Sequence, residues 1–425
     1  MKKVLLEAPI LTQSGYGEHS RLVFRSLINS PDLEIYVNPL NWGNTGWIND
    51  YGKERERIEE CIRKFSEYIN ICKLNNQNLF FDKQIFVGIL NEFEKRAEES
   101  ICVTAGIETD IVSSSWLLAA NNGISKLIVP SEHSKSSFEN TSYEVSHPDR
   151  EEKNILKCLC PIEVVPYPVK QIESKNIDFK TDTDFNFLSI ALLGPRKNLE
   201  NMIIWFCEEF KNENVGLILK TGVSKGSVSD RQSTVEHLTN VIKNTAKDKK
   251  CKVYLLHGDL TDEEIHSLYN RKDIHCYVTA THGEGYGLPI FEAAYSGMPI
   301  IATNWSGHID FLSGTYKEGK KIKTKKLFSK VDYELHQIHP SVAWEGVLQE
   351  DAKWAYPKEK SLKSQMRKNF QNHNMYKKWA RALKDQLLNS HSPEIVESMM
   401  LKAIHPELTK KDIEWQDNLS KIEMV

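Results

Sequence analysis

The sequence has no C-x-x-C pair and no run of about 18 apolar residues, the length that a membrane-spanning helix needs. Its eight cysteines are scattered, several of them in apolar stretches such as SICVTAG and DIHCYVTA, which predicts buried reduced thiols. The opening stretch MKKVLLEAPI starts with basic residues, but its apolar part is too short for a signal sequence. These absences predict a cytoplasmic protein without a membrane span.

Charge of one sign is not in excess, because 55 Lys and Arg stand against 58 Asp and Glu, for a formal net charge of −3. That balance excludes a global attraction to nucleic acid or to an anionic membrane, so any such binding requires a local patch. Hydrophobic residues make up 40% and charged residues 27%, as in ordinary globular proteins. A length of 425 residues predicts two domains.

Apolar stretches bounded by turn residues recur along the chain and indicate buried parallel strands. The first, KKVLLEAPIL, precedes a loop with Gly15 and Gly17 and then a predicted helix, which is how a doubly wound sheet begins. The first half continues with LEIYVNPL, KQIFVGIL, SICVTAG, SKLIVPS and IEVVPYPV. A second series runs through FNFLSIALLG, VGLILKTG, CKVYLLHG, IHCYVTATHG and MPIIATNW. The fold class is therefore predicted to be α/β, with two halves that each begin anew.

The polar stretch 170–185 has no periodicity and separates the two series, which predicts a linker. We expect a first domain over residues 1–169, the linker over 170–185, a second domain over 186–360 and C-terminal helices over 361–425. The last region has helical spacing of four apolar residues: Met366, Phe370, Trp379 and Leu383.

The stretch THGEGYGLPIFEAAYSGMPII, residues 281–301, places a glycine turn between a predicted strand and a predicted helix. In open α/β sheets, ligands bind beyond the carboxyl ends of the strands, where helix N-termini attract anions. Gly285 and Gly287 would let the backbone approach a phosphate or a sugar, and Glu284 and Glu292 would accept bonds from hydroxyls. The stretch therefore suits a sugar nucleotide, although a lone glycine turn before a helix is common in ordinary structure.

The full pattern is a glutamate, seven residues and a second glutamate, with G-x-G-L-P between them. It resembles the E-x7-E signature of retaining glycosyltransferases of the GT-B fold, in the large family 4 group. PRKN at 195–198, LILKTG, GIETDIVSSSWLLAANNGISKLIVPSEHSKSSF and SGYGEHSR are also similar to that family. The resemblance implies two Rossmann-like domains that face a cleft, with C-terminal helices packing back towards the N-terminal domain. The first domain would take the acceptor, and the second would bind the nucleotide sugar.

The resemblance also implies roles for individual residues. Arg196 and Lys197 neutralise the donor diphosphate, Glu284 faces the transferred sugar, and Glu292 binds the ribose hydroxyls. The remaining donor-binding residues implied are Gly15, Gly17, Lys220, Gly285, Tyr286, Gly287 and Leu288. The donor would be a nucleoside-diphosphate sugar, a UDP-sugar first, with no bound cofactor.

The chain departs from the family pattern in two places. Many members have an arginine shortly before the lysine, where this chain reads IALLGP, so Arg196, Lys197 and Lys220 have to neutralise the diphosphate without it. Many members also place a histidine against the donor sugar. The matching stretch here, TAGIETD, offers Glu108 as a catalytic candidate instead.

Several stretches are similar to soluble glycosyltransferases of tailed phages: APILTQSGYGEHSR, NPLNWGNTGW and ATHGEG. That similarity implies a hydroxymethylated pyrimidine in DNA as the acceptor, in the host cytoplasm, with a cell-surface or polysaccharide glycan as the alternative. The basic stretch KEGKKIKTKKLFSK is a solvated loop or the place of an anionic acceptor, bound through Lys323, Lys325 and Lys326. His133 and His308 are further acceptor candidates, and each is equally consistent with a structural role.

Two other classes of protein share parts of this pattern. A GT-B scaffold without catalysis would be a sugar-binding protein, but the presence of Arg196, Lys197, Glu284 and Glu292 argues against it. A dinucleotide-dependent oxidoreductase would need G-x-G-x-x-G after the first strand, which is missing.

No metal site is predicted. Asp182-x-Asp184 matches the metal motif of the other large glycosyltransferase fold, but it lies in the predicted linker. Cys158 and Cys160 have no histidines at metal-binding spacing.

Overall fold

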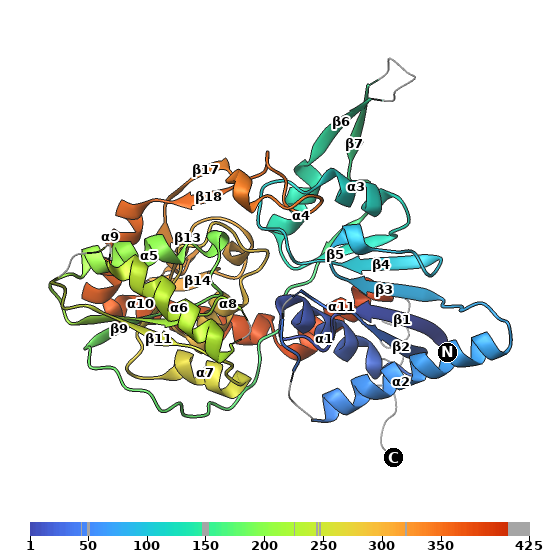
Figure 1. The fold of residues 1–425 in the computed structure, drawn as a ribbon, viewed down its shortest axis with the longest axis horizontal. Helices are drawn as coiled ribbons and strands as arrows, with labels where there is room; N and C mark the ends of the chain where they lie inside the picture. Colours follow the sequence, from blue (N-terminus) through green and yellow to red (C-terminus); the bar gives the residue numbers. More distant parts are fainter. Residues whose placement is uncertain are drawn as a thin grey trace.

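Two six-stranded parallel sheets, one in each half of the chain, form the centre of this computed structural model (Figure 1). The structure describes residues 1–43, 45–48, 52–146, 153–224, 226–243, 245, 248–318 and 321–406. The end of the predicted C-terminal region, residues 407–425, therefore lies outside the described residues.

The first sheet has the strand order β2-β1-β3-β4-β5-β8, with every neighbour parallel. Its strands are β1 (Lys2–Ala8), β2 (Leu33–Pro39), β3 (Lys83–Val87), β4 (Glu99–Val103), β5 (Lys126–Val129) and β8 (Ile162–Val164). These are the six apolar stretches expected in the first half. They read as continuous apolar runs because helices cover both faces of a parallel sheet.

The second sheet has the order β11-β10-β9-β12-β13-β16 and is also parallel throughout. Its strands are β9 (Phe185–Ile190), β10 (Val215–Lys220), β11 (Lys252–Leu256), β12 (Cys276–Val278), β13 (Ile300–Thr303) and β16 (Ser329–Val331). In chain order this is 3-2-1-4-5-6, the order of the dinucleotide-binding Rossmann sheet. The prediction of an α/β protein with two Rossmann-like parallel sheets is confirmed.

Helices connect the strands and cover the sheets. They are α1 (Gly15–Ile28), α2 (Lys53–Leu74), α3 (Ser114–Asn121), α4 (Glu132–Asn140), α5 (Leu199–Glu209), α6 (Val228–Lys243), α7 (Asp262–Asn270), α8 (Leu288–Ser296), α9 (Glu359–Gln371), α10 (His373–Ser390) and α11 (Pro393–Ile404). Polar residues start several of them: Ser14 caps α1, Ser131 caps α4, and Thr261 forms a capping box with Glu264 on α7. The helix predicted from residue 361 is divided at Asn372.

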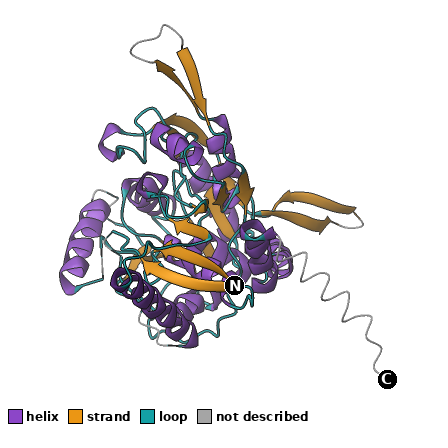
Figure 2. Cartoon of the chain, turned by 90° about the vertical axis from the view of Figure 1, so that its right-hand side faces the viewer, coloured by secondary structure: helices purple, strands orange, loops and turns teal. Residues whose placement is uncertain are grey.

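Three antiparallel hairpins were not predicted. They are β6–β7 (Ser142–Ser146 and Lys153–Lys157), β14–β15 (Ser313–Glu318 and Lys321–Lys326) and β17–β18 (Tyr333–Gln337 and Lys353–Pro357). Figure 2 shows the first two projecting from the body of the molecule. The stretch 317–330 is thus largely the β14–β15 hairpin and not the solvated loop expected from its lysines.

The chain passes between the domains twice. Residues 165–184 connect β8 to β9 without regular structure, and the predicted linker, 170–185, overlaps this stretch except at Phe185, which begins β9. The second passage lies between α10 and α11, and there the carbonyl of His391 accepts a hydrogen bond of 2.8 Å from the Val169 amide of the first passage. The two passages therefore lie side by side.

The C-terminal helices were all expected to pack back towards the first domain. Helix α11 does so (Figure 1), whereas α9 and α10 pack on the second domain. Four of its apolar residues join the core of that domain: Val396, Met400, Ala403 and Ile404. Lys83 and Lys126 donate to the last carbonyls of the helix, Ile404 O at 2.5 Å and Ala403 O at 2.7 Å. Cations at a helix C-terminus satisfy orphan carbonyls and oppose the negative end of the dipole.

The eight cysteines are all unpaired, and seven of them are buried, which confirms the expectation of reduced thiols. Within the described residues, no helix is both long enough and apolar enough to span a membrane.

We predict that Met400→Ala lowers the free energy of unfolding of the first domain by about 2–5 kcal/mol, because the side chain is fully buried and its removal leaves a cavity. Chemical denaturation followed by circular dichroism measures the change. Met399→Ala is the matched control, since Met399 is 38% exposed and should change stability by less than about 0.5 kcal/mol. Equal stability of the two variants would contradict the role of α11.

Candidate active site

The loops after β9 and β12 meet where the order of the second sheet reverses. β9 pairs with β10 on one side and with β12 on the other. The crevice at the carboxyl ends of two such strands is where open α/β sheets bind ligands. The β9 loop contributes the short helical turn Pro195–Lys197, and the β12 loop contributes the glycine turn that leads into α8.

Glu284 lies in this crevice and bonds both basic residues of the β9 loop. Arg196 Nη1 is 2.9 Å from Glu284 Oε2, and Lys197 Nζ is 2.6 Å from Glu284 Oε1. Thr281 Oγ1 donates a third bond of 3.0 Å. Burial would raise the pKa of Glu284, but the attraction of Lys197 and Arg196 outweighs it and holds this pKa well below its usual range. The carboxylate is therefore ionised at neutral pH.

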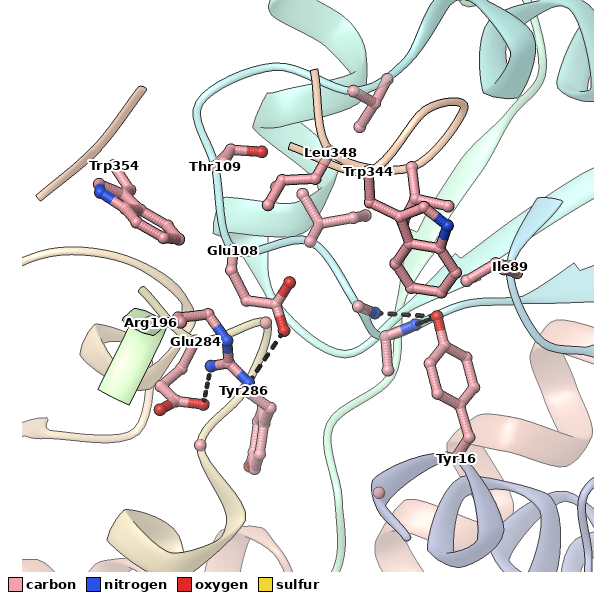
Figure 3. Close-up of a pocket in the computed structure, with 18 of the residues that line it drawn as sticks. Tyr16, Ile89, Glu108, Thr109, Arg196, Glu284, Tyr286, Trp344, Leu348 and Trp354 are labelled. Atoms are coloured by element: carbon pink, nitrogen blue, oxygen red, sulfur yellow. Dashed lines mark hydrogen bonds and ion pairs between the residues drawn. The ribbon is translucent and has the colours of Figure 1, made fainter. Parts of the chain in front are cut away.

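Glu108 brings a second carboxylate to Arg196 from the first domain. It lies in the loop after β4, and its Oε1 is 3.3 Å from Arg196 Nη2 (Figure 3). Burial and the neighbouring Arg196 both lower the pKa of Lys197. Two carboxylates and two cations thus face one another, and their formal charges cancel.

The glycine turn packs directly against the first domain. A Cβ on Gly285 would lie 1.8 Å from the carbonyl oxygen of Ala105, and one on Gly283 would lie 2.2 Å from that of Glu108. Ser131 Oγ, from the start of α4, donates a 2.6 Å bond to the Gly285 carbonyl. Gly285 was expected to be glycine so that a ligand could approach. Here it is the backbone of the other domain that requires the absence of a side chain.

Glycine is favoured at position 287 for a different reason. Its φ of +94° lies in the left-handed region, which favours glycine, and it is the N-cap of α8. Pro289 follows in the first turn of the helix, as predicted.

A cavity of about 570 Å³ lies between the domains, within the range of small-molecule sites. One part is charged and is formed by Glu108, Arg196, Lys197, Glu284 and the turn 285–289. The other part is apolar and aromatic. Its lining includes Trp42, Ile89, Ile107, Ile111, Val112, Trp116, Val342, Trp344, Val347, Leu348 and Trp354.

The structure brings nine of the predicted residues to this cavity: Gly15, Glu108, Arg196, Lys197, Glu284, Gly285, Tyr286, Gly287 and Leu288. Gly15 and Gly17 lie in the first turn of α1 and not in the loop expected before it. Gly17 is outside the lining, and a Cβ there would lie 2.1 Å from the carbonyl oxygen of Thr12. Local packing against Thr12 therefore explains why residue 17 is a glycine.

Glu292 and Lys220 are also outside the cavity lining. Glu292 lies one turn into α8, and its Oε2 accepts a 3.0 Å bond from the Tyr269 hydroxyl. Burial raises the pKa of Glu292 to about 7, against the opposing attraction of Lys170. Lys220 ends β10, next to β9, and burial lowers its pKa.

Neither predicted histidine lines the cavity. His308 is fully buried, with Nε2 2.7 Å from the Thr303 carbonyl and Nδ1 3.3 Å from Ser306 Oγ. Its ring is therefore structural, and the expected contact with an acceptor is corrected. His133 packs edge-on against Trp305 with ring centroids 4.8 Å apart, and burial lowers its pKa to about 4. It remains neutral at physiological pH.

The three predicted lysines lie on strand β15 of the β14–β15 hairpin, outside the cavity lining. Lys325 Nζ is held 4.2 Å from the centre of the Trp379 ring, and Lys326 Nζ donates a 2.7 Å bond to Asn304. Lys323 is exposed. Lys325 and Lys326 thus already have partners within the protein, which the sequence did not indicate.

Asp182 of the D-x-D motif bonds Lys252 and the hydroxyl of Tyr254. In the part of the chain that the structure describes, no three His, Cys, Asp or Glu side chains are grouped so as to hold a metal ion.

Sequence reasoning missed the contribution of residues 338–352, which connect β17 to β18 and reach the cavity through Val342, Trp344, Val347 and Leu348. It also missed Tyr16, whose hydroxyl accepts bonds from the amides of Ala105 and Gly106. Tyr16 stands between two glycines and Trp344 stands two positions before Gly346, and neither pattern by itself indicates a cavity.

Comparison with known proteins gives a match to one family model over part of the chain and identifies the fold. The family model "Glycosyl transferases group 1" matches residues 170–325, less than half of the chain. A comparison with curated protein sequences finds no match.

Solved structures match along the whole chain. Sucrose-phosphate synthase from Thermosynechococcus elongatus has a TM-score of 0.59 at 10% identity, covering 97% of this chain and 100% of its own. HepE from Anabaena, solved in complex with UDP and glucose, has a TM-score of 0.52 at 12% identity and coverages of 95% and 99%. A glycosyltransferase from Rickettsia africae has a TM-score of 0.53 at 12% identity and covers 99% of both chains.

At these identities the solved structures establish the fold, and the family model locates the sequence pattern. The chain therefore has the two-domain GT-B fold of glycosyltransferases, and its residues 170–325 have the sequence pattern of the group 1 glycosyl transferases.

Proposed function

We propose that this protein is a retaining glycosyltransferase that moves a hexose-type sugar from a nucleoside diphosphate, a UDP-sugar, to an acceptor hydroxyl. The observation that supports this most directly is the position of Arg196, Lys197 and Glu284 at the switch point of the second sheet, opposite Glu108. Cations and the N-terminus of α8 suit a diphosphate, and carboxylates suit sugar hydroxyls.

The reaction needs no covalent intermediate on the protein. The bond between the sugar C1 and the diphosphate oxygen breaks, and the acceptor oxygen bonds C1 on the same face. The acceptor proton passes to the departing diphosphate, whose new charge Arg196 and Lys197 stabilise. Stabilisation of charge that develops in the transition state is usually the largest contribution to catalysis.

Donor binding rearranges the charges at Arg196. The guanidinium is held by Glu108 at 3.3 Å and by Glu284 at 2.9 Å, and it also donates to the Gly283 carbonyl at 2.8 Å. A diphosphate would replace carboxylate contacts of Arg196 and Lys197, which frees Glu284 for the hydroxyls of the transferred sugar. Glu108 then lies on the acceptor side of the reacting carbon, where a carboxylate can accept a bond from the attacking hydroxyl.

For the acceptor we propose a hydroxymethylated pyrimidine in DNA, as in the tailed-phage proteins that the chain resembles, with the enzyme acting in the cytoplasm of the host. A cell-surface or polysaccharide glycan is the alternative acceptor. A catalytically inactive sugar-binding protein is the alternative from another class. Hydrolysis of a UDP-sugar without any acceptor distinguishes the enzyme from the binding protein.

We predict that Lys197→Ala lowers turnover by roughly two orders of magnitude while the fold persists, because one charge-assisted contact to the leaving group is lost. Donor hydrolysis measures the effect. Lys211→Ala, at an exposed lysine after α5, is the control and should keep full activity. Parental turnover in a folded Lys197→Ala variant would remove Lys197 from the mechanism.

We predict that Glu292→Ala weakens the binding of UDP by about tenfold or more, even with no sugar attached, because hydrogen bonds to charged groups contribute about 1.5–3 kcal/mol. Calorimetry at pH 8 is the measurement, since the pKa of Glu292 is raised to about 7 and the carboxylate predominates only above that pH. Glu236→Ala, on the exposed face of α6, is the control. Equal affinities of parent and Glu292→Ala would exclude the ribose contact.

If DNA is the acceptor, its affinity should fall with salt, because each phosphate contact releases counterions and contributes about 0.9 to the slope of log affinity against log salt. Replacing Lys323, Lys325 and Lys326 with alanine should reduce the slope by less than the value of about 3 that three free charges would give, since Lys325 and Lys326 already have partners. Single-stranded hydroxymethylcytosine DNA should react at least as well as duplex, because the base must leave the stack. Failure to bind or modify such DNA with any common UDP-sugar would leave the glycan alternative.

A further inference from the structure

The charged residues account for only part of the lining of the cavity between the domains. The diphosphate and the sugar are assigned to its charged part, beside Arg196 and Glu284. The ribose contact is assigned to Glu292, which lies outside the cavity lining. The apolar part is left for another group. A hydroxyl-rich ligand placed there would lose its hydrogen bonds to water without finding new ones, which costs free energy.

Residues 338–352 form one wall of this apolar part, although they belong to the second domain. The segment connects β17 to β18 and extends towards the first domain (Figure 1). At its tip Gly346, with a φ of +76°, allows a tight turn in which the amide of Leu348 bonds the carbonyl of Trp344 at 2.7 Å. Its side chains Val342, Trp344 and Leu348 line the cavity.

Contacts at the tip of the segment and just after its C-terminal end fix its position. At the tip, Ser115 Oγ on α3 donates a 3.1 Å bond to the carbonyl of Gly346. Near its end, the Lys353 amide donates a 2.6 Å bond to Asp110 Oδ1, and the Asp110 amide bonds the Lys353 carbonyl at 3.0 Å. On the other side, Trp354 stacks on His282 of the β12 loop, with centroids 4.8 Å apart. The segment is therefore attached to the first domain and to the donor-side loop.

Trp344 presents a large aromatic surface at this wall. It lines the cavity yet remains 59% exposed, whereas Trp116 and Trp354, which line the same cavity, are 1% and 3% exposed. Figure 3 shows its indole beside Ile89, near the hydroxyl of Tyr16 and away from Arg196. The accessible indole at the edge of the apolar part of the cavity offers a flat face to a ligand.

We propose that residues 338–352 complete the acceptor site and that the ring of Trp344 stacks on the face of a flat aromatic ring that bears the acceptor hydroxymethyl group. This inference rests on the proposed function, since it assigns the acceptor side of the same cavity. The chemistry recognised is that of a hydroxymethylpyrimidine ring, which a free nucleoside and an exposed base of a single strand both supply. Stacking of a base on an aromatic side chain contributes to affinity and is tolerant of sequence, because every base has a π-face.

The acceptor site is complete only when the domains are in contact. Ile89 and Val112 come from the first domain, and Trp344 comes from the second. A ring bound between them would therefore favour the closed arrangement, in which Glu108 also faces Arg196.

The test uses full-length protein with UDP-glucose, UDP-galactose and UDP-N-acetylglucosamine as donors. The acceptors are 5-hydroxymethyl-2′-deoxycytidine and a single-stranded oligonucleotide containing that base. Trp344→Ala should lower kcat/KM for transfer by about tenfold to a hundredfold, mainly through KM for the acceptor. Trp344→Phe should restore most of the loss, because it keeps a flat ring. Glu345→Ala, at an exposed neighbour in the same turn, should behave as the parent.

Calorimetric binding of the free nucleoside in the presence of UDP gives a readout independent of turnover, and a melting curve confirms that each variant is folded. Weaker nucleoside binding by Trp344→Ala supports the assignment. If Trp344→Ala weakens the reaction with both the nucleoside and the oligonucleotide, the ring itself is recognised. If it weakens only the reaction with the oligonucleotide, recognition also requires contacts to the phosphates of the strand. Equal kcat/KM and equal binding in parent and Trp344→Ala would overturn the inference, as would transfer to a glycan but to neither pyrimidine probe. Absence of donor hydrolysis in the parent would instead contradict the proposed function.

Discussion

The guanidinium of Arg196 is bonded by carboxylates of both domains, and the arrangement of the charged part of the cavity depends on it. An arginine in a protein does not lose its proton, so a buried one needs acceptors on several sides. Here Glu284 and the Gly283 carbonyl supply them from one domain, and Glu108 supplies one from the other. The same closeness brings the Gly285 backbone against the first domain. One charge requirement therefore fixes the distance between two independently folded sheets.

Much of this fold follows from local sequence. Every strand of the first sheet and five of the second could be predicted, because apolar runs bounded by turn residues are needed wherever helices cover both faces of a sheet. The glycine turn before α8 could also be placed, since its positive φ and following proline are local requirements. The missing sheet strand, β16 (Ser329–Val331), has the sequence SKV with an exposed Lys330, so no apolar run marks it.

Contacts between distant segments could not be predicted in the same way. The sequence marked Gly285 as special, but only the structure shows that the Ala105 carbonyl is what excludes a side chain there. Nothing near His308 indicated that Thr303 and Ser306 would engage both of its nitrogens. The segment 338–352 has neither helical nor strand periodicity, so its place beside the cavity arises from its attachment at Ser115 and Asp110. Such tertiary partners leave no pattern in neighbouring residues.

The bond between Val169 and His391 joins the two stretches of chain that pass between the domains. Two adjacent crossings act as a pivot, so the domains are restricted to rotation about a short axis near that bond. The segment 338–352 contacts the first domain at Ser115, away from this pivot. A few degrees of rotation there would leave the pivot almost unchanged, yet would separate Gly346 from Ser115 and admit an acceptor. The speed of such an opening would then be set by the rim contacts, which are few and polar, and not by the buried cores of the two domains.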